Sequence, residues 1–280
     1  MDRYWNTFVE GYTGYANYLY HEVTHLSWNN YFYWLIAVSL FFFVLEVVIP
    51  WRKKQPVFRK DFWLDGFYMF FNFFLFSLII YSAASNVVVN LFNDGIGWVT
   101  GGFNLQANNP LNSFPMWAVL LTGFLVRDFV QWWIHRLLHR SDTLWAFHKV
   151  HHSVEEMGFA AHLRYHWMEN VVYNVLQYIP LAMIGFGIDD FFIVYVFTLA
   201  VGHFNHSNIR VPLGPLKSVP NNPQMHIWHH AKAWPEGRDH GINFGITLSL
   251  WDYLFGTADI PSDGRDIPLG FPGSEDFPKD

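Results

Sequence analysis

The chain contains no cysteine among its 280 residues. This absence excludes disulfide bonds, thiolate zinc sites, cysteine nucleophiles and cysteine-ligated iron–sulfur clusters. The sequence also lacks the glycine-rich fingerprint that binds a dinucleotide. If the protein carries out redox chemistry, its electrons are therefore expected to come from a separate partner.

Charge is also scarce, because only 14% of the residues are charged and the formal net charge is −6. Binding to nucleic acid requires a concentrated basic surface, so no nucleic acid partner is expected. Residues 1–30 lack the basic start and short apolar core of a signal peptide. Their aromatic residues suit either an amphipathic segment at a membrane interface or a soluble lid.

Long apolar runs dominate the first half of the sequence, and 52% of all residues are hydrophobic. Tyr31 to Pro50 contains a single charge, Glu46, and is long enough to cross a hydrocarbon layer of about 30 Å. The basic residues that follow predict that this end faces the cytoplasm. Further spans are expected at 66–92 and 115–133, with an external loop between them at 93–115. A helical hairpin is expected at 171–185 and 191–201.

These patterns predict an all-α fold, an integral-membrane helical bundle with a cytosolic helical cap that holds a di-metal histidine cluster. The expected organisation is an amphipathic segment at 1–30, a membrane-embedded domain at 31–257 and an extended tail at 258–280. Counting spans places 135–169 and 207–280 on the cytoplasmic side. A soluble protein with a very large core is the alternative.

Histidine is unusually abundant, with 15 residues, 13 of which lie between His135 and His240. Many stand three or four apart, which places their side chains on one face of a helix. Eight of them form one His-x-x-x-His and two His-x-x-His-His units. Buried imidazoles need partners, and metal ions accept neutral ring nitrogens. One metal takes about four to six ligands, so this number of imidazoles predicts two metals. Imidazole suits zinc, copper, iron and nickel alike, so the ligands alone do not select the metal.

The histidine units and their surroundings resemble the fatty acid hydroxylase superfamily, also called the sterol desaturase family, in its bacterial branch. The resemblance covers Asp128 to Thr257. The matching segments are Asp128-Phe-Val-Gln-Trp-Trp-Ile-His-Arg136, Trp145-Ala-Phe-His-Lys-Val-His-His-Ser153, Arg164-Tyr-His-Trp-Met-Glu169, His206-Ser-Asn208, Asn243-Phe-Gly245 and Trp251-Asp-Tyr-Leu-Phe-Gly-Thr257. Trp167 stands where the family pattern usually has proline.

The resemblance implies a di-iron centre, O₂ as co-substrate and an external electron donor, either a ferredoxin or a cytochrome with its reductase. It implies metal ligands at His135, His139, His148, His151, His152, His226, His229 and His230, with His206 joining them. His166 and His203 compete for the remaining positions, and His162 has the weakest match. The other histidines, His21, His25 and His240, are expected to have structural or supporting roles.

Carboxylates and amides near the histidine units are candidates for orienting the ligands, because a ligating imidazole usually donates its second N–H to an oxygen. The candidates are Asp128, Glu156, Glu169 and Asn208. A structural ion pair is the alternative for Asp128. The basic loop Arg52–Lys60 either docks an acidic electron donor or serves only as a topology signal.

The predicted function is O₂-dependent oxidation, by hydroxylation or desaturation, of an unactivated C–H bond in a lipid-like substrate such as a sterol or a fatty acyl chain. The predicted location is a bacterial inner membrane, crossed several times, with the metal site on the cytoplasmic side. A zinc-dependent membrane hydrolase with Glu155 or Glu156 as its base is an alternative. A metal transporter or sensor is another.

Overall fold

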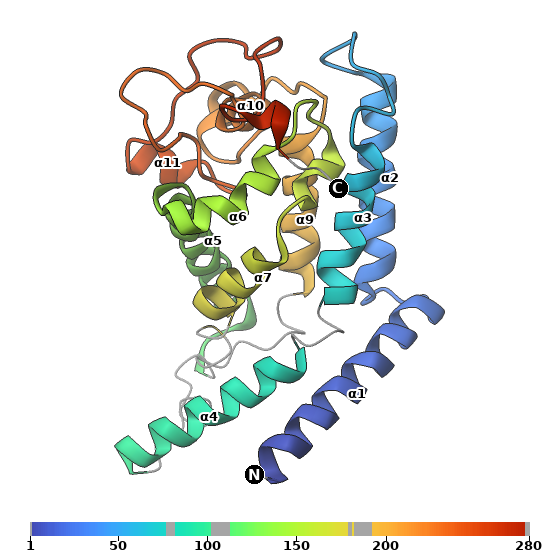
Figure 1. Cartoon of the computed structure of the whole chain (residues 1–280), viewed down its shortest axis with the longest axis vertical. Helices are drawn as coiled ribbons and strands as arrows, with labels where there is room; N and C mark the ends of the chain where they lie inside the picture. The colour runs from blue at the N-terminus through green and yellow to red at the C-terminus, as the bar shows by residue number, and fades with distance from the viewer. Residues whose placement is uncertain (1, 77–81, 102–112, 179–180, 182–191, 278–280) are drawn as a thin grey trace.

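The computed structural model describes residues 2–76, 82–101, 113–178, 181 and 192–277, and these residues are mainly helical (Figure 1). The α-helices are α1 (Asp2–Thr24), α2 (Tyr31–Val48), α3 (Phe62–Phe70), α4 (Ser82–Thr100), α5 (Met116–Arg140), α6 (Asp142–His152), α7 (Trp167–Tyr173), α9 (Phe192–His206), α10 (Pro223–His229) and α11 (Leu250–Leu254). Short π-helical turns span Phe71–Leu75 and Asn174–Tyr178. Short 3₁₀ turns span Phe159–Leu163, Gly214–Ser218 and Ser274–Asp276.

Helix α2 is apolar apart from Ser39, Glu46 and its aromatic hydroxyl groups, and it begins at a well-formed cap. The Asn30 side chain accepts a hydrogen bond from the Tyr33 backbone amide and donates to the carbonyl oxygens of Glu22 and His25. The first bond satisfies one free amide group at the start of the helix, and the other two fix the chain that leads into it. Among the described residues, α2 is the one helix long and apolar enough to cross a membrane. The predicted first span is therefore a continuous helix, but the multi-span bundle is not confirmed.

The predicted second span, 66–92, is divided between α3 and α4, and residues 77–81 lie outside the described part of the chain. Figure 1 shows α3 upright beside α2, whereas α4 is inclined and lies beside α1 at the far end from α10. The predicted loop at 93–115 was wrong at its start, because α4 continues to Thr100. Helix α1 packs along α4, and its Arg3 forms an ion pair of 2.8 Å with Asp94 in this polar stretch.

The predicted third span, 115–133, lies within α5, which continues through the first two histidines to Arg140. Helix α5 is long enough to cross a membrane but carries polar residues, including the buried Arg127 and Asp128. The predicted hairpin at 171–185 and 191–201 is described only in part, because residues 179–180 and 182–191 lie outside the described chain. Its second arm belongs to α9, a shorter apolar helix.

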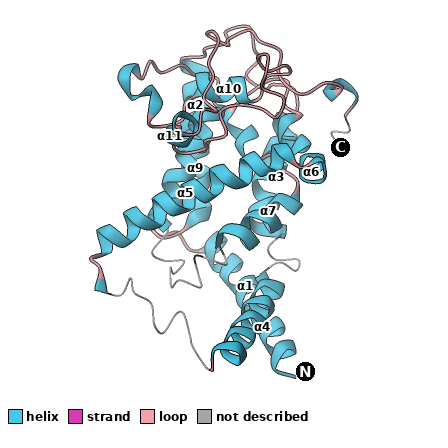
Figure 2. Ribbon diagram, turned by 90° about the vertical axis from the view of Figure 1, so that its left-hand side faces the viewer, coloured by secondary structure: helices cyan, strands magenta, loops and turns pink. Residues whose placement is uncertain are grey.

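A cap of short helices and long loops lies at the end of the molecule that contains α6, α10 and α11 (Figure 2). Its apolar core joins Trp51, Val154, Met157 and Ile227 with Leu269 from the C-terminal segment. That segment is tied to α10, since the Gly270 amide donates to the His230 carbonyl oxygen at 3.0 Å. The residues after 257 thus pack against the last histidine unit. The division into three segments at residues 30 and 257 stays a prediction.

Candidate metal centre

Nine buried histidines form two groups in the cap, and within each group the ligand nitrogens lie within 4.8 Å of one another. The first group contains His135, His139, His148, His152 and His229, and the second contains His151, His206, His226 and His230. They come from α5, α6, α9 and α10, together with the residue that follows α10. The structure therefore brings together all eight histidines of the three units, and His206 with them.

Each His-x-x-His-His unit is shared between the two groups. His148 and His152 stand one helical turn apart on α6 and enter the first group, whereas His151 enters the second. The last unit does the reverse, since His226 and His230 enter the second group and His229 enters the first. An i, i+4 pair lies on one helical face, and the intervening residue is rotated toward the neighbouring group.

Hydrogen bonds turn several rings so that Nε2 points inward. The Nδ1–H groups of His135, His151 and His229 donate to the carbonyl oxygens of Phe244, Arg164 and Ile242 at 2.7, 2.9 and 2.7 Å. His206 donates in the same way to Gly202 at 2.8 Å, and His148 is bonded to the Glu169 carboxylate at 2.9 Å. An Nδ1 donor leaves an unprotonated Nε2, which is the form that binds a metal.

The inward nitrogens lie as far apart as ligands of one ion do. The Nε2 atoms of the pairs His135–His148 and His152–His229 are both 3.1 Å apart in the first group. In the second group the pairs His151–His206, His206–His226 and His226–His230 are 3.3, 3.0 and 3.2 Å apart. Two nitrogens bound to one metal through bonds of about 2.1 Å stand about 3.0 to 3.4 Å apart. The residues present therefore fit one metal ion in each group.

Burial also favours the neutral ligand form. It lowers the pKa of His148 and of His151 from 6.5 to about 3, so both rings are uncharged at neutral pH. Burial raises the pKa of Glu169, the partner of His148, from 4.5 to about 7. His139 has no hydrogen-bond partner at either ring nitrogen, although both atoms are buried. A buried polar atom without a partner costs about 1–3 kcal/mol, and a metal ion would remove that cost for one of them.

The structure places the two remaining candidate ligands, His166 and His203, outside both groups. The ring nitrogens of His203 lie 3.0 Å from His162 Nδ1 and 3.0 Å from Ser39 Oγ, so both are engaged elsewhere. His166 is half-buried between Phe147 and Trp167, and its Nδ1 accepts the Met168 amide hydrogen. Away from the cap, His21 and His25 stack on each other at an exposed end of α1.

Of the four candidates for orienting the ligands, Glu169 is bonded to a histidine of the site, His148. The other three are bonded elsewhere in the fold. Asp128 accepts the indole N–H of Trp251 at 2.8 Å. Glu156 accepts the Lys60 amide and Asn208 joins the Arg52 backbone to Glu46. Asp128 lies on α5 seven residues before His135, but its carboxylate is bonded to Trp251 on α11 and not to that histidine.

Asp252 was not among the residues selected from the sequence. It fixes the backbone that orients one ring of the first group. It is fully buried and accepts four hydrogen bonds, from the indole of Trp132, the amides of Phe244 and Gly245, and the hydroxyl of Thr257. The carbonyl oxygen of the same Phe244 holds His135. The signal in the sequence was the segment Trp251–Thr257, which resembles the family but does not reveal which backbone groups the aspartate binds.

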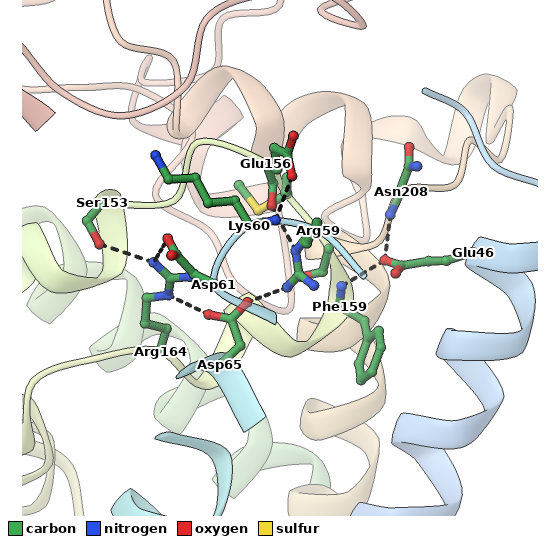
Figure 3. Close-up of polar contacts among 12 residues, drawn as sticks. Glu46, Arg59, Lys60, Asp61, Asp65, Ser153, Glu156, Phe159, Arg164 and Asn208 are labelled. Atoms are coloured by element: carbon green, nitrogen blue, oxygen red, sulfur yellow. Dashed lines mark hydrogen bonds and ion pairs between the residues drawn. The ribbon is translucent and has the colours of Figure 1, made fainter. Parts of the chain in front are cut away.

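A buried ionic network supports the second group (Figure 3). Asp65 on α3 is fully buried between the guanidinium groups of Arg59 and Arg164 and forms ion pairs with both. Arg164 also reaches Asp61 and Ser153, each at 3.3 Å. Because the Arg164 carbonyl oxygen accepts the Nδ1–H of His151, the network fixes the backbone that orients this ring.

Comparison with known proteins agrees with the resemblance of the sequence motifs to the fatty acid hydroxylase superfamily. The family model for fatty acid hydroxylase matches residues 120–257, which begin within α5 and contain α6, α7, α9, α10 and α11. The matched segment, residues 120–257, belongs to the fatty acid hydroxylase family. No solved structure matches it.

Three curated relatives illustrate the range of this superfamily. An ornithine lipid hydroxylase of Rhizobium tropici is 31% identical over 58% of this chain and 48% of its own length. An alkylglycerol monooxygenase of Xenopus tropicalis is 34% identical over 50% of this chain and 30% of its own. A putative methylsterol monooxygenase of Dictyostelium discoideum is 25% identical over 92% of this chain and 90% of its own. The chain thus spans half or less of the first two relatives.

Proposed function

We propose that this protein is a di-iron oxidoreductase that uses O₂ to hydroxylate an unactivated C–H bond of a lipid-like substrate. The observation that carries the proposal is the presence of two adjacent groups of five and four buried histidines. The names of the relatives, one hydroxylase and two monooxygenases, support oxidation and favour hydroxylation over desaturation. They also support a lipid as the substrate class, such as a sterol or a fatty acyl chain.

The first group would hold one iron and the second group the other, and a bound iron pair supplies the O₂ chemistry that oxidises a C–H bond. The chain's own residues prepare the site. Phe244, Glu169 and Arg164 bind the outer nitrogens of three rings, which turns the opposite nitrogens of those rings toward the site. Burial keeps the site dry, which limits wasteful side reactions of a strong oxidant. His166 and His203 are assigned no ligand role.

Overall, the reaction R–H + O₂ + 2 e⁻ + 2 H⁺ gives R–OH + H₂O. The electrons come from outside the chain, because the sequence has no cysteine for an iron–sulfur cluster and no dinucleotide fingerprint. A ferredoxin or a cytochrome with its reductase fits this need.

We place the protein in a bacterial inner membrane, crossed several times. Helix α2 exposes Leu40, Phe41 and Val44 to its surroundings, and α9 likewise exposes Ile193 and Phe197. Apolar side chains of this kind on neighbouring helices suit contact with lipid. The end of α2 leads into Trp51–Lys54 and lies at the level of the cap in Figure 1. By the positive-inside rule the metal site then faces the cytoplasm.

The test is to purify the protein in lipid nanodiscs and measure its bound metals, O₂ uptake and effect on host lipids. We expect two irons per chain, O₂ uptake that depends on reductant, and a lipid that gains the mass of one oxygen atom. Loss of two hydrogens would mean desaturation instead. One tightly bound zinc with lipid cleavage would establish the hydrolase, and weakly held, exchangeable metal would establish a transporter or sensor.

A further inference from the structure

A groove of about 310 Å³ opens on the surface beside the first histidine group. The C-terminal end of α5, the loop 237–241 and residues 255–257 after α11 form its walls. Arg136, Arg140, Arg238 and His240 line it, together with one acidic residue, Asp239. The whole chain has a net charge of −6, so this groove is a local concentration of positive charge on an acidic protein.

The floor of the groove is in direct contact with the first histidine group. Phe244 lines the groove, and its ring centre lies 5.2 Å from that of His139 and 5.9 Å from that of His135. Gly241 lines it too, and a Cβ atom built on this glycine would lie 3.1 Å from Nδ1 of His139. That nitrogen is buried and has no hydrogen-bond partner. A single layer of residues thus separates the groove from a candidate ligand.

Two arginines at the C-terminal end of α5 carry charge that no carboxylate among the described residues neutralises, although the Arg136 guanidinium lies over the Trp132 ring at 5.5 Å. Arg136 and Arg140 each follow a candidate ligand directly and stand four residues apart, a spacing at which like charges destabilise a helix. In the part of the chain that the structure describes, neither forms an ion pair with a carboxylate. Arg238 has a partner in Asp259, at 3.3 Å. Two unpaired cations at the mouth of a groove attract an anionic partner.

Exposed apolar side chains lie near these cations. Trp133 on α5, Leu254 at the end of α11 and the adjacent Phe255 are 55%, 64% and 51% exposed. Arginine and aromatic residues together are typical of surfaces that bind another protein. By contrast, the basic loop at 52–60 uses part of its charge within the fold. Arg52 donates to the Met157 carbonyl oxygen at 2.7 Å, and Arg59 is buried against Asp65.

We propose that this groove docks an acidic one-electron carrier protein and that Phe244 and Gly241 form the wall through which electrons reach the first metal. The inference rests on the proposed function, because only a redox site needs such a partner. Each hydroxylation consumes two electrons, so the carrier docks twice per turnover, delivers one electron each time and leaves oxidised. Electron transfer slows steeply with distance, and this groove brings the surface within one residue of a ligand ring.

The test uses the full-length protein in nanodiscs, with an acidic plant-type ferredoxin and its NADPH-dependent reductase as the probe. The variant Arg136→Glu/Arg140→Glu is compared with Lys53→Glu/Lys54→Glu, which makes the same charge change on the exposed part of the basic loop. Ferredoxin-driven turnover should fall at least about tenfold in the first variant, the scale of electrostatic steering, and should change little in the second. Both variants should bind as much iron as the wild type. After reduction with dithionite, both should also form as much product in one turnover as the wild type does.

The outcomes separate the inference from the proposed function. If wild-type protein binds no iron or oxidises no lipid, the proposed function itself fails. If wild type is active and the arginine variant matches it with ferredoxin, or the lysine variant shows the larger loss at unchanged iron content, the docking site is wrong. If dithionite-driven product falls equally, the groove holds an anionic lipid headgroup instead.

The variant Arg136→Gln/Arg140→Gln removes the two charges without reversing them. It takes the place of the charge-reversed variant in the same comparison if the charge-reversed protein loses iron. Raised salt should slow the ferredoxin reaction of wild type and leave that of the variant nearly unchanged.

Discussion

His139 is the candidate ligand whose two ring nitrogens both lack a hydrogen-bond partner in the described structure. The rings of His135, His148 and His229 are each held by an oxygen behind them, so their orientation does not depend on a metal. His139 is instead confined by close packing against Trp145, Phe244 and Gly241. A metal ion is the one partner that its location offers.

Replacing His139 by alanine should therefore remove at least half of the bound iron and lower turnover by two orders of magnitude or more. His166→Ala is the matched control, because His166 is a neighbouring histidine outside both groups. It should retain two irons and most of the activity. Iron is measured per chain by plasma mass spectrometry. If the His166 variant lost as much iron as the His139 variant, the assignment of His139 to a metal-binding group and of His166 to neither group would be contradicted.

Asp252 acts on His135 through the backbone of Phe244. Changing it to asparagine replaces one acceptor oxygen by an N–H₂ group that opposes the donors around it. Loss of support behind a ligand typically weakens metal binding by about 10–100-fold, and we expect a loss in that range. Competition with a chelator measures it. The exposed Asp276→Asn serves as control, and equal iron affinity in the two variants would refute the role of Asp252.

At the scale of helices, α6 and α10 each deliver ligands to both groups, whereas α5 serves the first and α9 the second. The nine histidines of the two groups were all among the ligands expected from spacing and resemblance. Their partition was not predictable, because it depends on the angles at which helices distant in sequence cross. His203 shows the same limit. Its spacing of three from His206 looks like a ligand pair, but α9 turns it toward Ser39 and His162.

The fold was predictable where one sequence pattern extended over a whole helix, as in α2. It was not predictable in α4, where Gly95 and Gly97 indicated a loop although contact with α1 maintains the helix to Thr100. Tertiary packing outweighs such local preferences. Buried polar residues were also missed. Asp65 and Asp252 each bind groups about 100 residues away, and a single sequence gives no indication of such partners.

The ionic network of α3 leads to a prediction for stability. Asp65→Ala would leave Arg59 and Arg164 buried without their shared carboxylate, which costs about 3–5 kcal/mol in comparable cases. Asp94→Ala removes the partly exposed ion pair with Arg3 and should cost less than about 1 kcal/mol. Thermal denaturation in detergent compares the two. If both variants lost a similar free energy of unfolding, the buried ionic network would not be a main source of the stability of the cap.

For the whole molecule, the buried histidines predict how the metal-free protein responds to pH. The pKa of His148 and of His151 is about 3 in the folded chain and near 6.5 when unfolded. Between these values the unfolded chain binds more protons, so stability falls as pH falls below about 6.5. The melting temperature of the metal-free protein should be highest above pH 7 and drop steadily toward pH 5. A flat profile would show that these rings are not buried and neutral.

Because each His-x-x-His-His unit is shared between the two groups, the two ions should load cooperatively. An ion in one group aligns α6 and α10, and the same two helices then present their remaining rings to the other group at a lower entropic cost. At half-saturation we expect a mixture of empty and doubly loaded molecules, with few that hold a single ion. Native mass spectrometry distinguishes these species directly, and a dominant singly loaded form would mean that the groups fill independently. An organism short of iron would then hold fewer complete enzymes rather than many incomplete ones.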